Sequence, residues 1–170
     1  MRGELWRQAG RLLAYPGPAF EAELTRCREA LEDERLSPFF QAILGLTPAE
    51  REELFVRTFD FDPATTLELG WHLYGEDYRR GEFLVQCRQI LRRAGVAEGG
   101  ELPDHAGRLL PALALLPEEE AGPFVKTYVL PALDKLLEAL SRRQNPYADL
   151  FAALVAEAPD GASGGAYERA

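Results

Sequence analysis

The sequence contains little cysteine and little positive charge, and each shortage excludes classes of protein. Its 170 residues include only two cysteines, Cys27 and Cys87, which are far apart and form no Cys-x-x-Cys pair. A disulfide-rich scaffold and a cysteine-based zinc site are therefore excluded, and both thiols are expected to be buried. The formal net charge of −9 argues against nucleic acid and against an anionic membrane surface, because both attract a basic face.

Long hydrophobic runs are also missing. No apolar stretch approaches the roughly 18 residues that a membrane-spanning helix needs. The first residues, Met-Arg-Gly-Glu-Leu-Trp-Arg-Gln, are charged and amphipathic, and they lack the apolar centre and cleavage site of a secretory signal. The protein is therefore expected to be cytoplasmic.

Strand-like alternation is absent, whereas helix boundaries are marked throughout the chain. The clearest start signal is Thr47-Pro48-Ala49-Glu50, in which Thr47 can cap a helix and Glu50 can reach back to the Thr47 amide. Pro123 and Pro131 are expected to break or kink the segment that contains them. Such signals predict helices over residues 4–15, 19–31, 38–44, 48–58, 63–74, 77–94, 103–116, 118–140 and 146–157.

The fold class that follows is all-α, a single-domain, irregular helical bundle. The helical domain is expected to cover residues 1–158. The remainder, residues 159–170, is rich in Gly, Ala and Ser and is expected to be a disordered tail.

One stretch, residues 55–81, concentrates aromatic side chains beside acids, and it contains one of the two histidines. A second short stretch, Glu101-Leu102-Pro103-Asp104-His105, contains the other. We expect these two stretches to face each other and to form the working surface. The aromatic rings either all belong to the core or partly line an apolar groove with an acidic rim, which would suit an amphipathic helical peptide with basic residues at one end. The rings are Phe55, Phe59, Phe61, Trp71, Tyr74 and Tyr78.

Structural roles and other functions compete with this interpretation. Asp62 precedes Pro63 and is the expected cap of a helix, and His72 could link helices as a half-buried side chain. A different class of function is a small metal-dependent hydrolase, although no two of its candidate ligands have strong metal-ligand spacing. Its residues would be Asp60, His72, Asp104 and His105. A third possibility is a permanent subunit of an oligomeric complex that buries the aromatic stretch in an interface.

Several motifs, in a fixed order, resemble the NarJ branch of the TorD-like redox-enzyme maturation chaperones. The resemblance covers roughly residues 54–116. The pair formed by Phe-Asp-Phe-Asp and Glu-Leu-Pro-Asp-His is the most specific part of it. The motifs are Thr58-Phe59-Asp60-Phe61-Asp62, Thr65-Thr66-Leu67, His72-Leu73-Tyr74-Gly75, Arg80-Gly81 and Glu101-Leu102-Pro103-Asp104-His105.

The resemblance implies an all-helical TorD-like fold and no catalytic turnover. It implies a cytoplasmic chaperone that binds the N-terminal, twin-arginine-like peptide of the catalytic (alpha) subunit of a respiratory nitrate reductase. The molybdenum cofactor would be handled indirectly, within that client, with no cofactor bound permanently by the chaperone. Contact with the membrane would occur only through the client complex, and the chaperone would be a monomer or a helix-swapped dimer.

The family motifs also imply a set of peptide-binding residues, with the Pro-Asp-His loop at the border of the groove. We expect Asp104 to pair with a basic residue of the client and His105 to position the loop. On this hypothesis, Asp104→Ala weakens client binding several-fold and leaves helicity intact. The implied residues are Phe59, Asp60, Leu67, Trp71, His72, Tyr74, Gly75, Arg80, Gly81, Leu102, Pro103, Asp104 and His105.

Overall fold

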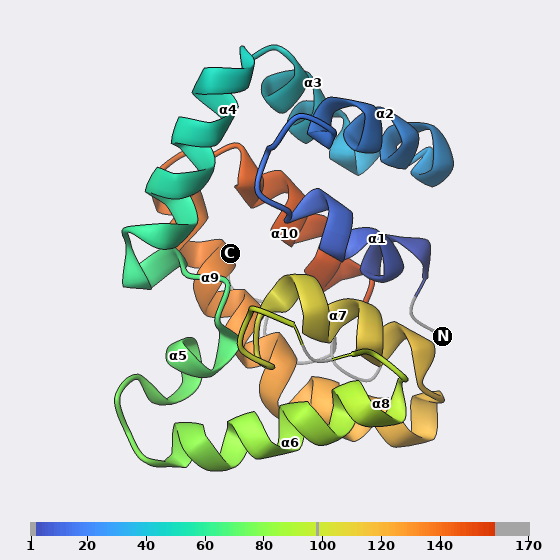
Figure 1. Ribbon diagram of the computed structural model, residues 1–170, viewed down its shortest axis with the longest axis vertical. Coiled ribbons are helices and arrows are strands. Elements are labelled where there is room, and N and C mark those ends of the chain that lie inside the picture. The colour runs from blue at the N-terminus through green and yellow to red at the C-terminus, as the bar shows by residue number, and fades with distance from the viewer. Residues whose placement is uncertain (1–2, 98, 159–170) are drawn as a thin grey trace, which may run out of the picture.

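The structure is a computed structural model that describes residues 3–97 and 99–158 (Figure 1). Regular structure in these ranges is helical, which confirms the predicted all-α class. The α-helices are α1 (Glu4–Leu12), α2 (Phe20–Leu31), α3 (Ser37–Leu44), α4 (Pro48–Phe55), α5 (Leu69–Tyr74), α6 (Arg79–Arg93), α7 (Ala106–Leu115), α8 (Glu118–Phe124), α9 (Leu130–Arg142) and α10 (Tyr147–Ala156). Short 3₁₀ turns are η1 (Glu34–Leu36) and η3 (Pro63–Thr65), and π-helical turns are η2 (Val56–Asp60) and η4 (Val125–Val129). The predicted tail, residues 159–170, lies outside the described residues.

The predicted capping box is present at the start of α4. The Thr47 side chain accepts a hydrogen bond from the Glu50 amide at 3.2 Å, and the Glu50 carboxylate accepts one from the Thr47 amide at 2.9 Å. Each side chain thus satisfies an amide that would otherwise lack a partner. The predicted cap at Asp62 is also confirmed, but the helix after it is not, because Asp62 caps only the single turn η3.

Tertiary pairing overrides two predicted helix starts. Thr66 and Glu68 have extended backbone. Their segment pairs with the loop before α7 through hydrogen bonds from the Leu69 amide to the Asp104 carbonyl (3.0 Å) and from the Ala106 amide to the Leu67 carbonyl (2.8 Å). The predicted helix 63–74 is therefore wrong, since α5 begins only at Leu69. The helix predicted from Pro103 is wrong at its start for the same reason, and α7 begins at Ala106.

The segment 118–140 remains helical through both prolines. Between α8 and α9 the helix widens into the π-helical turn η4, which lies between Pro123 and Pro131. A wider turn accommodates a proline that cannot donate a backbone hydrogen bond, so of the two predicted outcomes, a break or a kink, the break does not occur and the irregularity takes the form of this turn. The turn η2 follows α4 in the same way, and the two segments are similar in sequence, Phe-Val-Arg-Thr-Phe at 55–59 and Phe-Val-Lys-Thr-Tyr at 124–128.

The core runs without interruption from the helices at the top of Figure 1 to those at its bottom. Trp6 in α1 is fully buried and donates a hydrogen bond from its indole nitrogen to the Leu154 carbonyl in α10 at 2.9 Å. Cys27 and Cys87 are buried and free, as predicted. In the part of the chain that the structure describes, every helix is too short or too polar to cross a bilayer.

Close contact between α1 and α7 positions one wall of the site described below. A Cβ added at Gly10 would lie 2.8 Å from the backbone oxygen of Gly107, a distance that real Cβ atoms essentially never show. Only glycine therefore allows the two backbones to approach this closely.

Gly10→Ala is expected to lower the free energy of unfolding by about 1–2 kcal/mol, because the overpacking exceeds the helix propensity gained, about 1 kcal/mol. Gly81→Ala is the matched control, because Gly81 also lies within a helix but has open space around its Cα. The Gly81→Ala substitution should leave the free energy of unfolding unchanged or raise it. Urea denaturation measures both, and equal effects of the two substitutions would contradict the packing argument.

Candidate functional site

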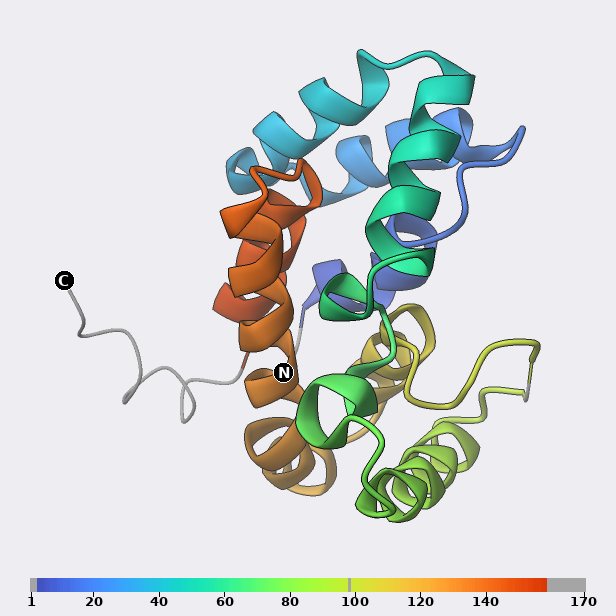
Figure 2. The ribbon, with the colours of Figure 1, turned by 90° about the vertical axis from the view of Figure 1, so that its left-hand side faces the viewer.

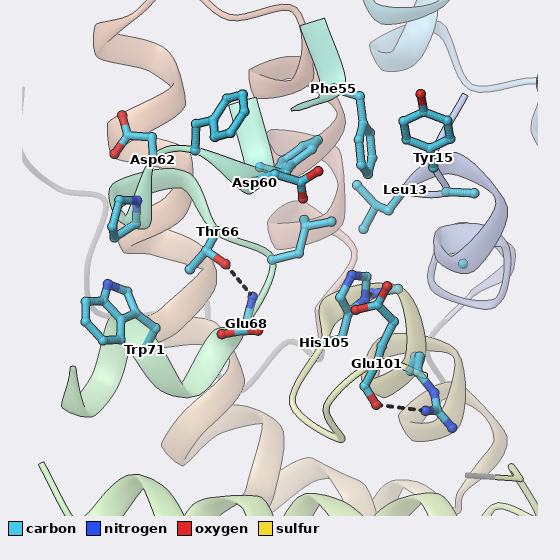
Figure 3. A pocket seen from close by; sticks show the side chains of 18 of the residues that line it. Leu13, Tyr15, Phe55, Asp60, Asp62, Thr66, Glu68, Trp71, Glu101 and His105 are labelled. Atoms are coloured by element: carbon cyan, nitrogen blue, oxygen red, sulfur yellow. Dashed lines mark hydrogen bonds between the residues drawn. The ribbon is translucent and has the colours of Figure 1, made fainter. Parts of the chain in front are cut away.

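A cavity of about 750 Å³ lies where five segments meet. They are the end of α1 with the residues that follow it, the α4–η2 corner, residues 60–71, the start of α6 at Arg80, and the loop before α7 with the first turn of that helix (Figure 3). Figure 2 shows α4, η2 and the extended segment running down one side of the molecule toward α5, with the loop before α7 beside them. The cavity therefore opens between segments that are far apart in the sequence.

The two sequence stretches face each other, as predicted. Glu68 and His105 form an antiparallel β-bridge, the only one in the described residues. This bridge holds Glu68, Trp71 and His105 along one edge of the cavity, and Figure 3 shows them on neighbouring segments.

Aromatic side chains form the apolar wall of the cavity. Phe55 and Phe59 are buried, with ring centroids 5.0 Å apart, and Tyr15 packs edge-on against Phe55 at 5.7 Å. Phe61 is 80% exposed and Tyr15 is 53% exposed. The aromatic cluster therefore divides into core rings and rings that face solvent at the cavity, so the groove alternative holds for part of it.

Acidic side chains form the rim. Four carboxylates line the cavity, and two already have cationic partners: Asp62 pairs with Arg143 at 2.6 Å, and Glu68 pairs with Arg80 at 2.8 Å. Asp60 and Glu101 are exposed, and neither carboxylate forms a salt bridge with a basic side chain of the described ranges, although Arg108 donates to the backbone carbonyl of Glu101. The rim therefore keeps two carboxylates that form no salt bridge within the described residues.

Asp104 is fully buried beneath this rim. Its Oδ2 accepts a hydrogen bond from the Gly70 amide at 2.9 Å and lies 3.5 Å from Arg80 Nη2. Burial raises the pKa of Asp104 above its usual range, while the Gly70 amide and Arg80 oppose that shift. In this conformation a client residue cannot reach the carboxylate, because the structure turns it inward to organise the backbone of α5.

His105 begins α7 as its N-cap. Its Nδ1 accepts a hydrogen bond from the Gly107 amide at 3.1 Å, a role that requires a neutral ring with the proton on Nε2. Burial lowers the pKa of His105, and the negative charge of Glu101 opposes this. His105 therefore caps α7, a role that the sequence did not predict, and its expected role in positioning the loop stays a prediction.

The His105 cap predicts a pH dependence of stability. In the unfolded chain the imidazole has a pKa of about 6.5, and folding lowers it, so the native state takes up the proton less readily. The stability that the neutral His105 ring contributes is fully present above pH 6.5, and it is lost as the pH falls through the folded-state pKa of His105. His105→Asn keeps a capping oxygen but does not titrate.

Between pH 7.5 and 5.5, wild type should lose about 1 kcal/mol more free energy of unfolding than His105→Asn. Urea denaturation at the two pH values measures the difference. Burial also lowers the pKa of His72, but His72 is present in both proteins, so its effect on stability cancels in the comparison. Equal losses would show that His105 does not titrate against folding.

The cavity collects six of the residues that the sequence motifs imply and leaves out seven. Three of the seven that lie outside the cavity make contacts elsewhere. The His72 Nε2 atom forms a hydrogen bond with the Thr66 carbonyl at 2.7 Å, and Tyr74 packs on Phe83. Gly75 ends α5 with a φ angle of +57°. The six that line it are Phe59, Asp60, Leu67, Trp71, Arg80 and His105, and the seven others are His72, Tyr74, Gly75, Gly81, Leu102, Pro103 and Asp104.

Sequence reasoning missed several cavity residues. Leu13 and Tyr15 come from the end of α1, and their only signal was the Pro16-Gly17-Pro18 stop that follows them. Glu101 opens the Glu-Leu-Pro-Asp-His motif, and Glu68 lies inside the aromatic stretch, so both could have been proposed.

The metal-dependent hydrolase has no assembled site. In residues 3–97 and 99–158, no group of three or more His, Cys, Asp or Glu side chains is placed to hold a metal ion. Of the four proposed ligands, Asp60 and His105 line the cavity, Asp104 is buried, and the His72 ring bonds a backbone carbonyl. The described residues therefore do not gather the four side chains of this alternative into one metal-binding group.

Comparison with known proteins connects this geometry to a family. Residues 19–153 match the family described as nitrate reductase delta subunit. A protein of Escherichia coli K12 named nitrate reductase molybdenum cofactor assembly chaperone NarJ is 30% identical over 151 residues, which are 83% of this chain and 64% of that protein. A Bacillus subtilis protein named "Probable nitrate reductase molybdenum cofactor assembly chaperone NarJ" is 28% identical over 153 residues, 85% of this chain and 83% of the relative.

The chain thus spans less than two thirds of the length of the E. coli relative. Both relatives are named as chaperones and neither as a catalyst, which agrees with the prediction that this chain is not an enzyme. Because the match over residues 19–153 covers most of the chain, this protein belongs to the nitrate reductase delta subunit family.

Proposed function

We propose that this protein is a cytoplasmic assembly chaperone for a respiratory nitrate reductase. It binds the catalytic subunit through a basic, twin-arginine-like N-terminal peptide while the molybdenum cofactor is inserted. Family membership and the names of the relatives support the nitrate reductase client. The observation that carries peptide binding is the cavity itself, in which an aromatic wall meets a rim with two unneutralised carboxylates.

The chemistry of the cavity fits a peptide that is apolar along one side and basic at one end. Exposed rings such as Tyr15 and Phe61 offer apolar contact area, which supplies most of the affinity. Asp60, Glu101 and the net charge of −9 attract cationic residues and act mainly on the association rate. A chaperone must release its client, so we expect micromolar affinity, about −8 kcal/mol.

The molybdenum cofactor is handled within the client. An anionic cofactor needs free basic groups, whereas the two arginines that line the cavity are engaged. Arg80 pairs with Glu68, and Arg108 donates to the Glu101 carbonyl at 3.1 Å. This arrangement supports indirect handling of the cofactor.

Calorimetric titration with a synthetic peptide from the N-terminus of the client subunit tests the proposal. We expect saturable micromolar binding that weakens as salt is raised. Asp60→Asn/Glu101→Gln should weaken binding about fivefold to thirtyfold, because each exposed ion pair contributes up to about 1 kcal/mol. Glu29→Gln/Glu32→Gln changes the net charge equally on exposed residues outside the cavity and should have little effect.

Absence of binding to the peptide would be followed by a pull-down with the full catalytic subunit. Capture there would move recognition to the folded client, and failure of both would overturn the proposed function. Equal effects of the rim and control pairs would remove the cavity from the binding site. Whether the chaperone is a monomer or a helix-swapped dimer stays a prediction, which sedimentation of the same sample measures.

A further inference from the structure

Two carboxylates share one guanidinium at the edge of the cavity. Arg80 Nη2 donates to Glu68 Oε2 at 2.8 Å and lies 3.5 Å from Asp104 Oδ2. The Asp104 side chain is fully buried, that of Arg80 is 20% exposed, and that of Glu68 is 37% exposed. The group therefore carries one more negative charge than positive charge, in surroundings that are partly shielded from water.

Two buried atoms of this group lack hydrogen-bond partners. They are Nε of Arg80 and Oδ1 of Asp104, a donor and an acceptor on neighbouring side chains. An unsatisfied buried polar group destabilises the folded state, so the present arrangement leaves favourable interactions unmade. Arginine presents its N–H groups as a rigid fork that matches both oxygens of a carboxylate.

Arg80 is the member of the group that can move. Asp104 is held by the Gly70 amide, and a Cβ added at Gly70 would lie 2.7 Å from Asp104 Oδ2, so the carboxylate is fitted against bare backbone. The Arg80 side chain is long and partly exposed. A shift on the order of 1 Å would allow its guanidinium to donate hydrogen bonds to both oxygens of the Asp104 carboxylate. That shift weakens its contact with Glu68.

Glu68 would then face the cavity without a partner. Glu68 lines the cavity together with Trp71, and Figure 3 shows the two side chains on the same side of the cavity. We propose that Glu68 receives a cationic side chain of the bound peptide, and that Arg80 moves from Glu68 onto Asp104 as it does so. The exchange gives each carboxylate its own cation. This inference rests on the proposed function, in which a basic peptide occupies the cavity.

A double-mutant cycle tests the exchange. The probe is the client N-terminal peptide, together with versions in which one arginine at a time is replaced by citrulline, its uncharged analogue. The variants are Glu68→Gln, Asp104→Asn and the double variant, since asparagine can still accept from the Gly70 amide. Asp33→Asn is the control, because Asp33 pairs with an arginine, Arg35, outside the cavity.

Each single variant should weaken binding of the unmodified peptide about fivefold to tenfold. The double variant should lose no more than Glu68→Gln alone, because Asp104 acts only by releasing Glu68. One citrulline peptide, the one that lacks the arginine bound by Glu68, should bind wild type and all three variants with the same affinity. Additive losses, or equal losses for every citrulline peptide, would overturn the exchange and leave Asp104 a structural role.

Nuclear magnetic resonance gives a readout that a folding defect cannot imitate. The Arg80 Nε–H signal, assigned with Arg80→Lys, should move downfield when peptide binds wild type, because Nε gains a carboxylate acceptor. It should stay in place in Asp104→Asn. An unchanged signal with bound peptide would overturn the exchange alone, whereas a wild type that binds neither peptide nor client overturns the proposed function and the exchange with it.

Discussion

Phe59→Ala is expected to lower the free energy of unfolding by about 3–5 kcal/mol, the range for removing a large aromatic ring from a packed core. Phe59 is only 4% exposed although it lines the cavity. Its ring lies 4.7 Å from Tyr147, 5.0 Å from Phe55 and 6.5 Å from Phe151. It therefore joins the α4–η2 corner to α10 from behind the cavity wall.

Phe61→Ala is the matched control for this substitution. Phe61 lies two residues further along the chain at the same cavity, but it is 80% exposed. Its replacement should change stability by less than about 0.5 kcal/mol and should weaken peptide binding instead. Urea denaturation and calorimetric titration of both variants separate the two roles. Similar stability losses would show that burial does not distinguish the two rings.

The contrast between these two phenylalanines shows what the sequence could predict. The Phe-Asp-Phe-Asp corner predicted that both rings lie close together at one surface, and both line the cavity. Phe59 lies within η2, a π-helical turn, whereas Phe61 follows the end of that turn, so the two rings occupy different local backbone. Local helix signals carry no information about such a turn.

Local signals succeeded wherever the interactions that set a boundary were themselves local. The Thr47 and Glu50 capping box is an example, because both hydrogen bonds join residues three apart. The same signals failed at Pro63 and Pro103. There the backbone of residues 67–69 pairs with that of residues 104–106, and this pairing across about 35 to 39 positions determines where α5 and α7 begin.

The role of Asp104 was mistaken for a related reason. The family motif implied that Asp104 pairs with a basic client residue, and the expected several-fold loss in Asp104→Ala assumed that direct contact. The structure buries Asp104 and gives its carboxylate to Gly70 and Arg80. Asp104→Ala would therefore leave Arg80 and the Gly70 amide without their partner, and it would disturb stability together with binding.

Arg80→Ala is expected to lower the free energy of unfolding by about 3 kcal/mol near pH 7.5, because it leaves a buried carboxylate without its cation. The loss should be smaller in Arg80→Ala/Asp104→Asn, which removes the unpaired charge while keeping an acceptor for the Gly70 amide. Arg79→Ala, which removes an exposed arginine paired with Asp77 on the surface, should remain close to wild type. Urea denaturation of the three variants measures these differences.

The pH dependence of Arg80→Ala identifies Asp104 as the cause. Burial raises the folded pKa of Asp104 above its unfolded value, so the native state binds the proton more tightly, and loss of Arg80 raises that pKa further. The deficit of Arg80→Ala relative to wild type should therefore shrink as the pH falls from 7.5 to 5.5, and it should not shrink in the double variant. A deficit that is the same at both pH values would mean that the guanidinium stabilises the fold by packing alone. In that case Asp104 could not compete with Glu68 for the charge of Arg80, and the proposed exchange at the cavity would lose its driving force.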